Sequence, residues 1–352
     1  MSKHDQPPDA LDKHPPAWHF DKFVEFTKYK QEIGEPSPHL AMVGHMIRGH
    51  TEEEKLWLLG TYAATYCLPS AQALWELQPM ADVRRRGPEK LEAWLTKHWK
   101  GVVTRTERRC VRTPKKMREC LWSYIQWVDN EYPKLKELAK REKDNYSTEN
   151  YDTVWESVAG VKFFGRYIAI RYIEGLRRYF GVPALLYDIR SVGGWSPKRA
   201  LSYLYPQHTA ALLRDDKESN DLTNDLAYAL LARVQKKLPK VNEYVIAAML
   251  CEYKGAFENW HQYPGHTIDQ EPDLHAKVAA YWGNEIESKL IWSTRKALFP
   301  AEVLGELSGW SSYRHDLAKV LRDYGYNWSD LRYDYVATLK TGNFAKPVRW
   351  KD

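Results

Sequence analysis

The side chains most suited to chemistry lie on one predicted helix near residue 250, in the segment Cys251-Glu252-Tyr253-Lys254. Glu252 continues an apolar stripe at helical spacing that consists of Val241, Val245 and Ala248. A carboxylate on a buried helix face is costly unless it is paired or functional. Glu252 is therefore a candidate general base, and a buried structural ion pair is the alternative interpretation.

The chain that follows this helix supplies further acidic groups. A turn, Tyr263-Pro264-Gly265, leads into a loop that carries Asp269 and Glu271. Asp269 is the second candidate base. Cys251 is a candidate nucleophile, although a single cysteine within an apolar helix is more often a core residue.

A glycine-containing turn before a predicted helix forms a candidate anion site. Gly193 and Gly194 permit a tight turn, while Ser196 and Pro197 favour the start of a helix. The backbone N–H groups at that start, with Lys198 beside them, suit a phosphate of DNA. An ordinary turn between two helices is the alternative.

Positive charge is concentrated in one segment of a chain whose net charge is +6. From Arg84 to Arg118 there are 13 Lys or Arg residues against 3 Asp or Glu residues. Such a segment is the electrostatic footprint of a polyanionic partner, and a solvated charged face is the alternative. The candidate DNA-binding cations within it are Arg108, Arg109, Arg112, Lys115 and Lys116.

Several common classes of protein have no support in this sequence. It contains no glycine-rich nucleotide-binding loop, zinc-protease motif or nucleophile-elbow motif. Its four cysteines lie far apart, which fits neither a zinc site nor a disulfide framework and indicates a reducing compartment. Neither a signal peptide nor an apolar run of membrane-spanning length is evident, so we expect a cytoplasmic protein without a membrane partner.

Seven segments, in order along the chain, resemble the phage amino acid:DNA transferases, a family also called α-glutamyl/putrescinyl-thymine pyrophosphorylases. The segments are WLLGTYAATYCLPSA (57–71), RRCVRTPKKM (108–117), GRYIAIRYIEGLRR (165–178), DIRSVGGWSP (188–197), CEYKG (251–255), YPGHTIDQE (263–271) and RKALFPAEVLGE (295–306).

The resemblance implies an enzyme that modifies a base in DNA. In the family, a separate kinase first pyrophosphorylates 5-hydroxymethyluracil in phage DNA. The transferase then displaces the diphosphate with an amine from an amino acid or a polyamine, which gives a hypermodified thymine. The implied partners are double-stranded or locally opened phage DNA and a small amine or amino acid. Because diphosphate is itself a good leaving group, no cofactor is required.

This hypothesis gives each class of side chain a role. Glu252 or Asp269 would accept a proton from the amine, with Lys254 nearby. Cations would neutralise the departing diphosphate, and aromatic rings would stack on an extruded base. The candidate residues for substrate and diphosphate are Arg166, Arg190, Arg295, Tyr253, Tyr263, Trp195 and Glu271. A divalent metal held by Asp269 and Glu271 has no standard ligand spacing to support it, so no metal site is predicted.

Helices must position these groups, because the apolar residues recur at helical spacing and no alternating β pattern is evident. We therefore expect an all-α, multi-helix protein. Two helical lobes around a central cleft, arranged as in helix-hairpin-helix DNA glycosylases, are one such architecture. The expected divisions are a disordered arm over 1–17, a helical region with the basic segment over 18–150, and a helical region with the active-site motifs over 151–352.

Two other functions fit parts of the pattern. A helix-hairpin-helix-like DNA base glycosylase would use Asp215 or Asp216, which follow the glycine turn at roughly that family's spacing. A non-catalytic DNA-binding protein would need only the basic cluster. Substitution of the carboxylates distinguishes the three functions. The transferase needs Glu252 or Asp269, the glycosylase needs Asp215 or Asp216, and the DNA-binding protein needs none of them.

Overall fold

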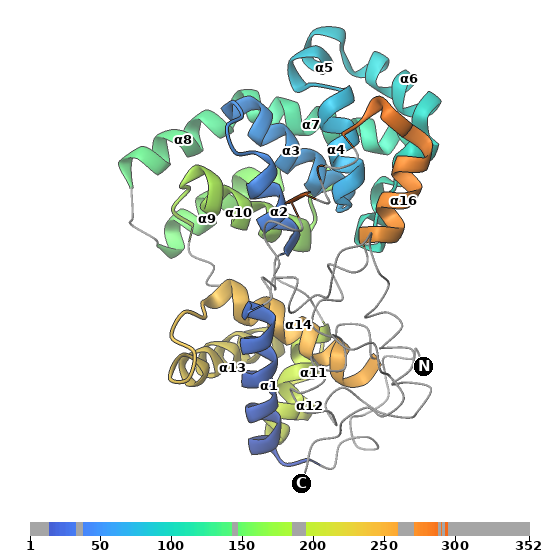
Figure 1. Ribbon diagram of the computed structural model, residues 1–352. Coiled ribbons are helices and arrows are strands. Elements are labelled where there is room, and N and C mark those ends of the chain that lie inside the picture. Colours follow the sequence, from blue (N-terminus) through green and yellow to red (C-terminus); the bar gives the residue numbers. More distant parts are fainter. Residues whose placement is uncertain are drawn as a thin grey trace, which may run out of the picture. The chain divides into compact units, whose positions relative to one another are not determined.

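The computed structural model describes residues 14–32, 38–142, 147–184, 195–259 and 271–287, together with 290, 293 and 294. Within these residues all regular elements are helices (Figure 1). The predicted all-α class is therefore confirmed. The loop with Gly193 and Gly194 lies outside the described residues, so the helix-hairpin-helix-like arrangement stays a prediction. None of the helices described is long and apolar enough to cross a membrane.

The chain forms two compact units, each built from separate stretches of sequence. The first unit combines residues 1–36, 188–266 and 313–352, and the second combines 37–187 and 267–312. The boundary expected near residue 150 falls inside the second unit, where α9 (Thr148–Ala159) packs against α10 (Arg166–Phe180).

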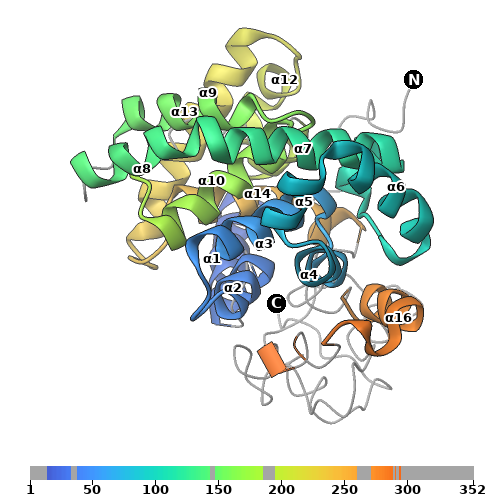
Figure 2. The ribbon, with the colours of Figure 1, turned by 90° about the horizontal axis from the view of Figure 1, so that it is seen from above.

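The second unit is organised around α3 (Glu52–Thr65), whose residues from Leu56 to Thr65 are all buried. This helix packs against α10 and two others (Figures 1 and 2), namely α4 (Leu68–Leu77) and α7 (Pro114–Asn130). The remaining α-helices of the unit are α2 (Pro38–Met46), α5 (Met80–Arg86), α6 (Pro88–His98), α8 (Tyr132–Arg141), α9 and α16 (Glu271–Trp282).

Capping residues begin two helices of this unit. Thr51 and Glu54 form a reciprocal capping box at the start of α3, which satisfies N–H groups that a helix leaves unpaired. Thr113 caps α7 by accepting a hydrogen bond from the Lys116 N–H, and Pro114 occupies the first turn.

Close packing between α3 and α7 makes the size of residue 60 critical. A Cβ atom added to Gly60 would overlap the ring of Tyr124. That ring cannot move aside easily, because its hydroxyl donates to the Leu56 carbonyl oxygen at 2.6 Å and is 2.8 Å from the Tyr172 hydroxyl. We therefore expect Gly60→Ala to lower the free energy of unfolding by about 1–3 kcal/mol, despite the better helix propensity of Ala.

Chemical denaturation of the full chain measures this effect. Gly165→Ala is the steric control, since an added Cβ there meets nothing within 4 Å, and at this N-cap of α10 it should cost only the capping preference for Gly over Ala. A Gly60→Ala protein as stable as its parent would contradict the packing between α3 and α7.

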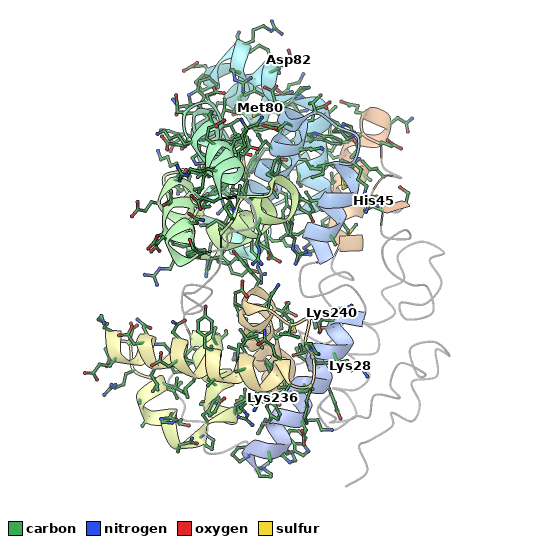
Figure 3. The ribbon with its side chains drawn as sticks, turned by 90° about the vertical axis from the view of Figure 1, so that its left-hand side faces the viewer. Lys28, His45, Met80, Asp82, Lys236 and Lys240 are labelled. Atoms are coloured by element: carbon green, nitrogen blue, oxygen red, sulfur yellow. The ribbon has the colours of Figure 1, made fainter. Side chains whose placement is uncertain are left out.

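The first unit brings together α1 (Pro16–Glu32), which begins within the arm predicted over 1–17, and helices from the middle of the chain. Here α1 packs on α11 and α14, and α14 packs on α11 and α13. The surface of this unit carries Lys28, Lys236 and Lys240 (Figure 3). The α-helices of this part are α11 (Trp195–Leu204), α12 (Thr209–Leu212), α13 (Lys217–Gln235) and α14 (Glu243–Asn259).

Candidate active site

Glu252 of α14 forms an ion pair with a lysine of α1, a helix that is distant in the sequence. Its Oε2 atom lies 2.8 Å from Nζ of Lys30, a side chain that is 0% exposed, while the Glu252 side chain is 13% exposed. Val241, Val245 and Ala248 are buried, as the apolar stripe predicted. The carboxylate on that stripe is thus paired through its buried Oε2 atom, and the Glu252 side chain as a whole keeps a small exposed fraction.

The environment of Lys30 explains how an ammonium group is tolerated inside the unit. The Phe26 ring lies 5.3 Å from Nζ, within range of a cation–π interaction. A buried charge of this kind is stable only with such partners, and the Glu252 carboxylate supplies the counter-charge. Lys30 was not among the residues predicted from the sequence, although it follows the buried Phe23 and Phe26 at helical spacing, the same signal that indicated Glu252.

Tyr253, the neighbour of Glu252, lies in the core rather than at a surface. Its ring is fully buried and contacts Phe23 and Phe26 edge to face. Its hydroxyl is 2.9 Å from Nδ1 of His19. In this arrangement the ring offers no face to a DNA base, which the stacking role predicted for Tyr253 would need, and its contacts instead fix α14 against α1.

The other two residues of the segment are half-buried. Cys251 carries a thiol, and Lys254 lies three positions further along the same helix. Of this segment, therefore, Glu252 and Lys254 combine a charged group with partial exposure.

Lys198 of α11 points into the first unit and not toward solvent. Its side chain is 5% exposed, and Nζ donates a hydrogen bond to the Arg214 carbonyl oxygen at 2.8 Å. Burial lowers the pKa of Lys198, and the carboxylates of Asp215 and Asp216 oppose that shift. This position does not suit the DNA-phosphate contact predicted for Lys198, because the ammonium group is already enclosed.

The remaining residues near the glycine turn are only partly described. Trp195 and Ser196 are half-buried at the start of α11. Asp216 caps α13 by accepting a hydrogen bond from the Ser219 N–H at 2.7 Å.

The five candidate DNA-binding cations of the basic segment separate into one buried and four exposed side chains. Arg108 is 1% exposed, and it donates to the carbonyl oxygens of Ala64 at 2.9 Å and Phe163 at 2.8 Å. This position does not suit the DNA contact predicted for Arg108, because the guanidinium group is buried and hydrogen-bonded within the second unit. The exposed members are Arg109, Arg112, Lys115 and Lys116.

A buried polar network in the second unit escaped the sequence analysis. Glu174 of α10 is 2% exposed and binds Arg171 at 3.1 Å and Arg178 at 2.5 Å. On the same helix, the hydroxyl of Tyr167 lies 2.6 Å from that of Tyr66, whose φ of 51° is left-handed. All five residues fall in two of the segments that carry the family resemblance.

The other predicted site residues lie at helix starts or outside the described part of the chain. Arg166 is exposed at the first position of α10, and Glu271 is the first residue of α16. The residues outside the described part are Arg190, Gly193, Gly194, Tyr263, Asp269 and Arg295. Among the residues that are described, no three His, Cys, Asp or Glu side chains gather as a metal site would require.

Comparison with known proteins gives one match. A family model described as amino acid:DNA transferase matches residues 37–261, which is more than half of the chain. No curated protein and no solved structure matches. The matched range includes Glu252 and the basic segment and excludes Lys30.

Proposed function

This chain belongs to the amino acid:DNA transferase family, and we propose that it joins an amine to the 5-methylene carbon of pyrophosphorylated 5-hydroxymethyluracil in DNA, with release of diphosphate. The amine comes from an amino acid or a polyamine. The reaction follows the action of a separate DNA base kinase, in the cytoplasm of the infected host if a phage encodes the chain. The charge-paired side chain of Glu252, which is 13% exposed and lies within the matched range, is the observation that carries this proposal.

The chemical step needs a base and a stabiliser of the leaving group. Glu252 takes a proton from the ammonium group, and the neutral nitrogen then forms a bond to the 5-methylene carbon. The bond between that carbon and the diphosphate oxygen breaks, and the electron pair leaves with the diphosphate. Cations stabilise the charge of the leaving group. Lys254 and Arg166 are the described candidates, and Arg190 and Arg295 are further ones.

Lys30 is the positioning residue for this base. At 2.8 Å, its ammonium group restricts the rotamers of Glu252, whose side chain stays partly exposed. Because Lys30 is fully buried, it holds the carboxylate without competing as a nucleophile at the surface.

The four exposed cations of the basic segment supply the contact with the DNA backbone. Replacing Arg109, Arg112, Lys115 and Lys116 by Ala is expected to weaken DNA binding and to flatten its salt dependence. For duplex DNA, the slope of log K against log salt should fall by about 0.9 for each phosphate that the protein no longer neutralises.

Fluorescence anisotropy at several salt concentrations measures that slope. The matched control replaces exposed lysines of α8, Lys134 and Lys140, which already pair with Glu131 and Glu137. If the control flattens the slope as much as the quadruple variant, the basic segment is not the interface.

The proposed reaction is tested with DNA that contains 5-pyrophosphomethyluracil, purified protein and a mixture of amines. The DNA is digested to nucleosides for mass spectrometry, and released diphosphate is assayed in parallel. We expect an amine-bearing thymidine in an amount that matches the diphosphate. Unchanged DNA would contradict the proposal and favour a DNA-binding protein without catalysis.

A DNA base glycosylase is the second candidate, on a specific observation. Asp215, one of the two carboxylates predicted for that function, is exposed beside Asp216, which caps α13. An exposed carboxylate is available for acid–base cleavage of a glycosidic bond. In the same assay this activity would release a free base and leave abasic sites.

A further inference from the structure

The second unit exposes one aromatic side chain next to residues of the basic segment. Tyr281 of α16 is 38% exposed, and among the residues that the structure describes it is the one large hydrophobic side chain with so open a position. A single exposed apolar residue is common on protein surfaces and needs no ligand. The contacts that hold this ring and the charges that flank it distinguish Tyr281 from that ordinary case.

The ring of Tyr281 is held in one orientation by its neighbours. Its hydroxyl lies 3.2 Å from Nδ1 of His98, and the Trp282 ring meets it edge to face with centroids 4.8 Å apart. A Cβ atom added to Gly101 would overlap both rings, so the short helix η2 (Trp99–Gly101) approaches α16 closely. An exposed ring that is already fixed loses little conformational freedom when a flat ligand stacks on it.

A stack of further rings supports this position. The Trp282 residue is 3% exposed, and the rings of Trp94 and His98 stack on it with centroids 5.5 Å and 5.2 Å away. The Trp282 N–H donates a hydrogen bond to the Gly101 carbonyl oxygen at 2.9 Å. These contacts join α16 to α6 and to η2, so the exposed ring belongs to a packed part of the second unit.

Three exposed lysines flank the Tyr281 ring. Lys277 lies one turn earlier on the same face of α16, and helical side chains lean toward the preceding turn. The other two, Lys97 and Lys100, directly precede the two residues of α6 and η2 that lie against the ring. An aromatic ring among cations is the combination with which proteins hold the bases and phosphates of single strands.

The charge of these lysines is not cancelled by described carboxylates. Within the part of the chain that the structure describes, none of the three forms an ion pair. Two exposed acids, Glu285 and Glu287, follow α16. Gly283, with a φ of 56°, takes the chain out of the helix before them, so helical spacing does not place them on the face of Tyr281. The described side chains that flank the ring therefore carry positive charge.

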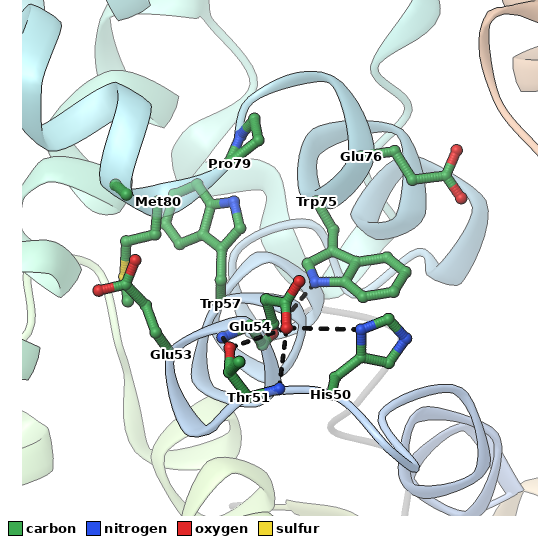
Figure 4. Close-up of a pocket in the computed structure, with 10 residues that line it drawn as sticks. His50, Thr51, Glu53, Glu54, Trp57, Trp75, Glu76, Pro79 and Met80 are labelled. Atoms are coloured by element: carbon green, nitrogen blue, oxygen red, sulfur yellow. Dashed lines mark hydrogen bonds and ion pairs between the residues drawn. The ribbon is translucent and has the colours of Figure 1, made fainter.

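Another aromatic site in the same unit has the opposite charge. The Trp75 ring lines a cavity of about 470 Å³ beside the start of α3 (Figure 4). No Arg or Lys lines this cavity, and its acidic residues are Glu53, Glu54 and Glu76. Phosphate groups would be repelled there. Trp75 is therefore a matched control for an aromatic ring without cations.

The surface at Tyr281 lies close along the chain to the exposed cations of the basic segment. Arg109 follows Gly101 by eight residues, so these two positions are at most about 28 Å apart. Phosphates follow one another along a DNA strand at about 3.4 Å in a duplex, so a stretch of roughly ten nucleotides reaches both. One strand can therefore contact the ring and the cations together.

We propose that the surface formed by Tyr281, Lys97, Lys100 and Lys277 binds an unpaired stretch of DNA. One base stacks on the Tyr281 ring, and the neighbouring phosphates lie beside the lysines. In a closed duplex both faces of a base are covered, so only an unpaired or extruded nucleotide can stack on a protein ring. The inference rests on the proposed function for the identity of the nucleic acid, and it deepens that function by assigning an opened strand as the form that is held here.

Fluorescence anisotropy of the full chain with labelled oligonucleotides tests this surface. The probes are a single strand of about twelve thymidines, the same strand with abasic residues in the place of half of them, and a hairpin duplex of similar length. We expect the thymidine strand to bind at least about fivefold more tightly than the abasic strand, because the abasic residues keep the phosphates and lose the stacking. Equal binding of these two strands would overturn the proposal without the use of any variant.

Substitutions of the ring locate the stacking. Tyr281→Ala should weaken binding of the thymidine strand by about 5- to 150-fold and leave duplex binding unchanged, which also shows that the variant is folded. Tyr281→Phe keeps a ring and should retain most of the affinity, and Trp75→Leu should change neither measurement. If Tyr281→Ala binds the thymidine strand as its parent does, or if it loses single strand and duplex to the same extent, the ring does not select unpaired bases.

Replacing the three lysines by Ala tests the contact with phosphates. The slope of log K against log salt for the thymidine strand should fall by about 0.7 for each phosphate that is no longer neutralised. The paired lysines of α8, Lys134 and Lys140, are again the control. An unchanged slope would contradict the arrangement. These assays measure no turnover, so strand selection without amine transfer would overturn the proposed reaction alone, and transfer without strand selection would overturn this inference alone.

Discussion

Glu252→Gln is expected to lower kcat for amine transfer by about 10²–10⁴-fold, the range in which removal of a general base acts. The substitution keeps the size and the hydrogen-bonding shape of the side chain and removes its ability to accept a proton. KM for DNA should change little, because the exposed cations of the basic segment lie elsewhere in the chain. Single-turnover assays, which separate chemistry from product release, measure this effect.

The ion pair with Lys30 complicates the same variant and provides its control. Gln at position 252 removes the carboxylate that lies 2.8 Å from a fully buried ammonium group, and losing one partner of a buried pair costs about 3–5 kcal/mol. The double variant Lys30→Met with Glu252→Gln removes both charges and should recover much of the stability. It should recover none of the activity.

Thermal unfolding of the single and double variants, alongside turnover, separates the two roles. Glu218→Gln, at an exposed carboxylate of α13 that pairs with Arg214, should be neutral in both measurements. A double variant that regains turnover together with stability would show that Glu252 is a structural partner of Lys30 and not a base.

Much of the fold could be predicted from the sequence, because helices are specified locally. Thr51 and Thr113 were identifiable as caps, since a capping residue acts on N–H groups within its own first turn. The stripe that leads to Glu252 was readable for the same reason, as helical spacing reveals which face of a helix is buried.

The pairing of Glu252 with Lys30 was not predictable in the same way. A helical pattern shows that a face is buried but not which other helix covers it. Lys30 lies on α1, far from α14 in sequence, and only the packing of these helices brings their charges to 2.8 Å. The division into units depends on such distant contacts too, which is why composition near residue 150 did not reveal it.

The basic segment illustrates a second limit, because neighbouring arginines look alike in sequence. Arg108 and Arg109 are adjacent and equally charged, but one is buried and the other is exposed. Local charge density predicts a DNA-binding surface, but it cannot show which of the arginines is buried in the interior. The two positions should therefore respond in opposite ways to substitution.

Arg108→Met is expected to lower the free energy of unfolding by about 1–3 kcal/mol or more, since one buried carbonyl oxygen left unsatisfied costs about that much and a second, part-buried one also loses its donor. One is the Ala64 oxygen in the last turn of α3, where carbonyl groups lack partners within the helix and a cation is favourable. The other belongs to Phe163, whose φ of 67° is left-handed. Such a conformation persists only where surrounding contacts hold it, and Arg108 supplies one of them.

Arg109→Met should show the reverse, with unchanged stability and weaker, less salt-dependent binding of DNA. Denaturant unfolding measures the stability of each variant, and fluorescence anisotropy measures its affinity for DNA. Together they show which arginine is structural and which contacts DNA. If Arg108→Met unfolds like its parent but binds DNA weakly, the guanidinium group reaches solvent in the working protein and the basic segment has five DNA contacts. If the Arg108→Met protein unfolds at a lower denaturant concentration and its folded fraction binds DNA normally, Arg108 holds α3 and the turn before α10 together. The exposed cations alone then form the DNA interface.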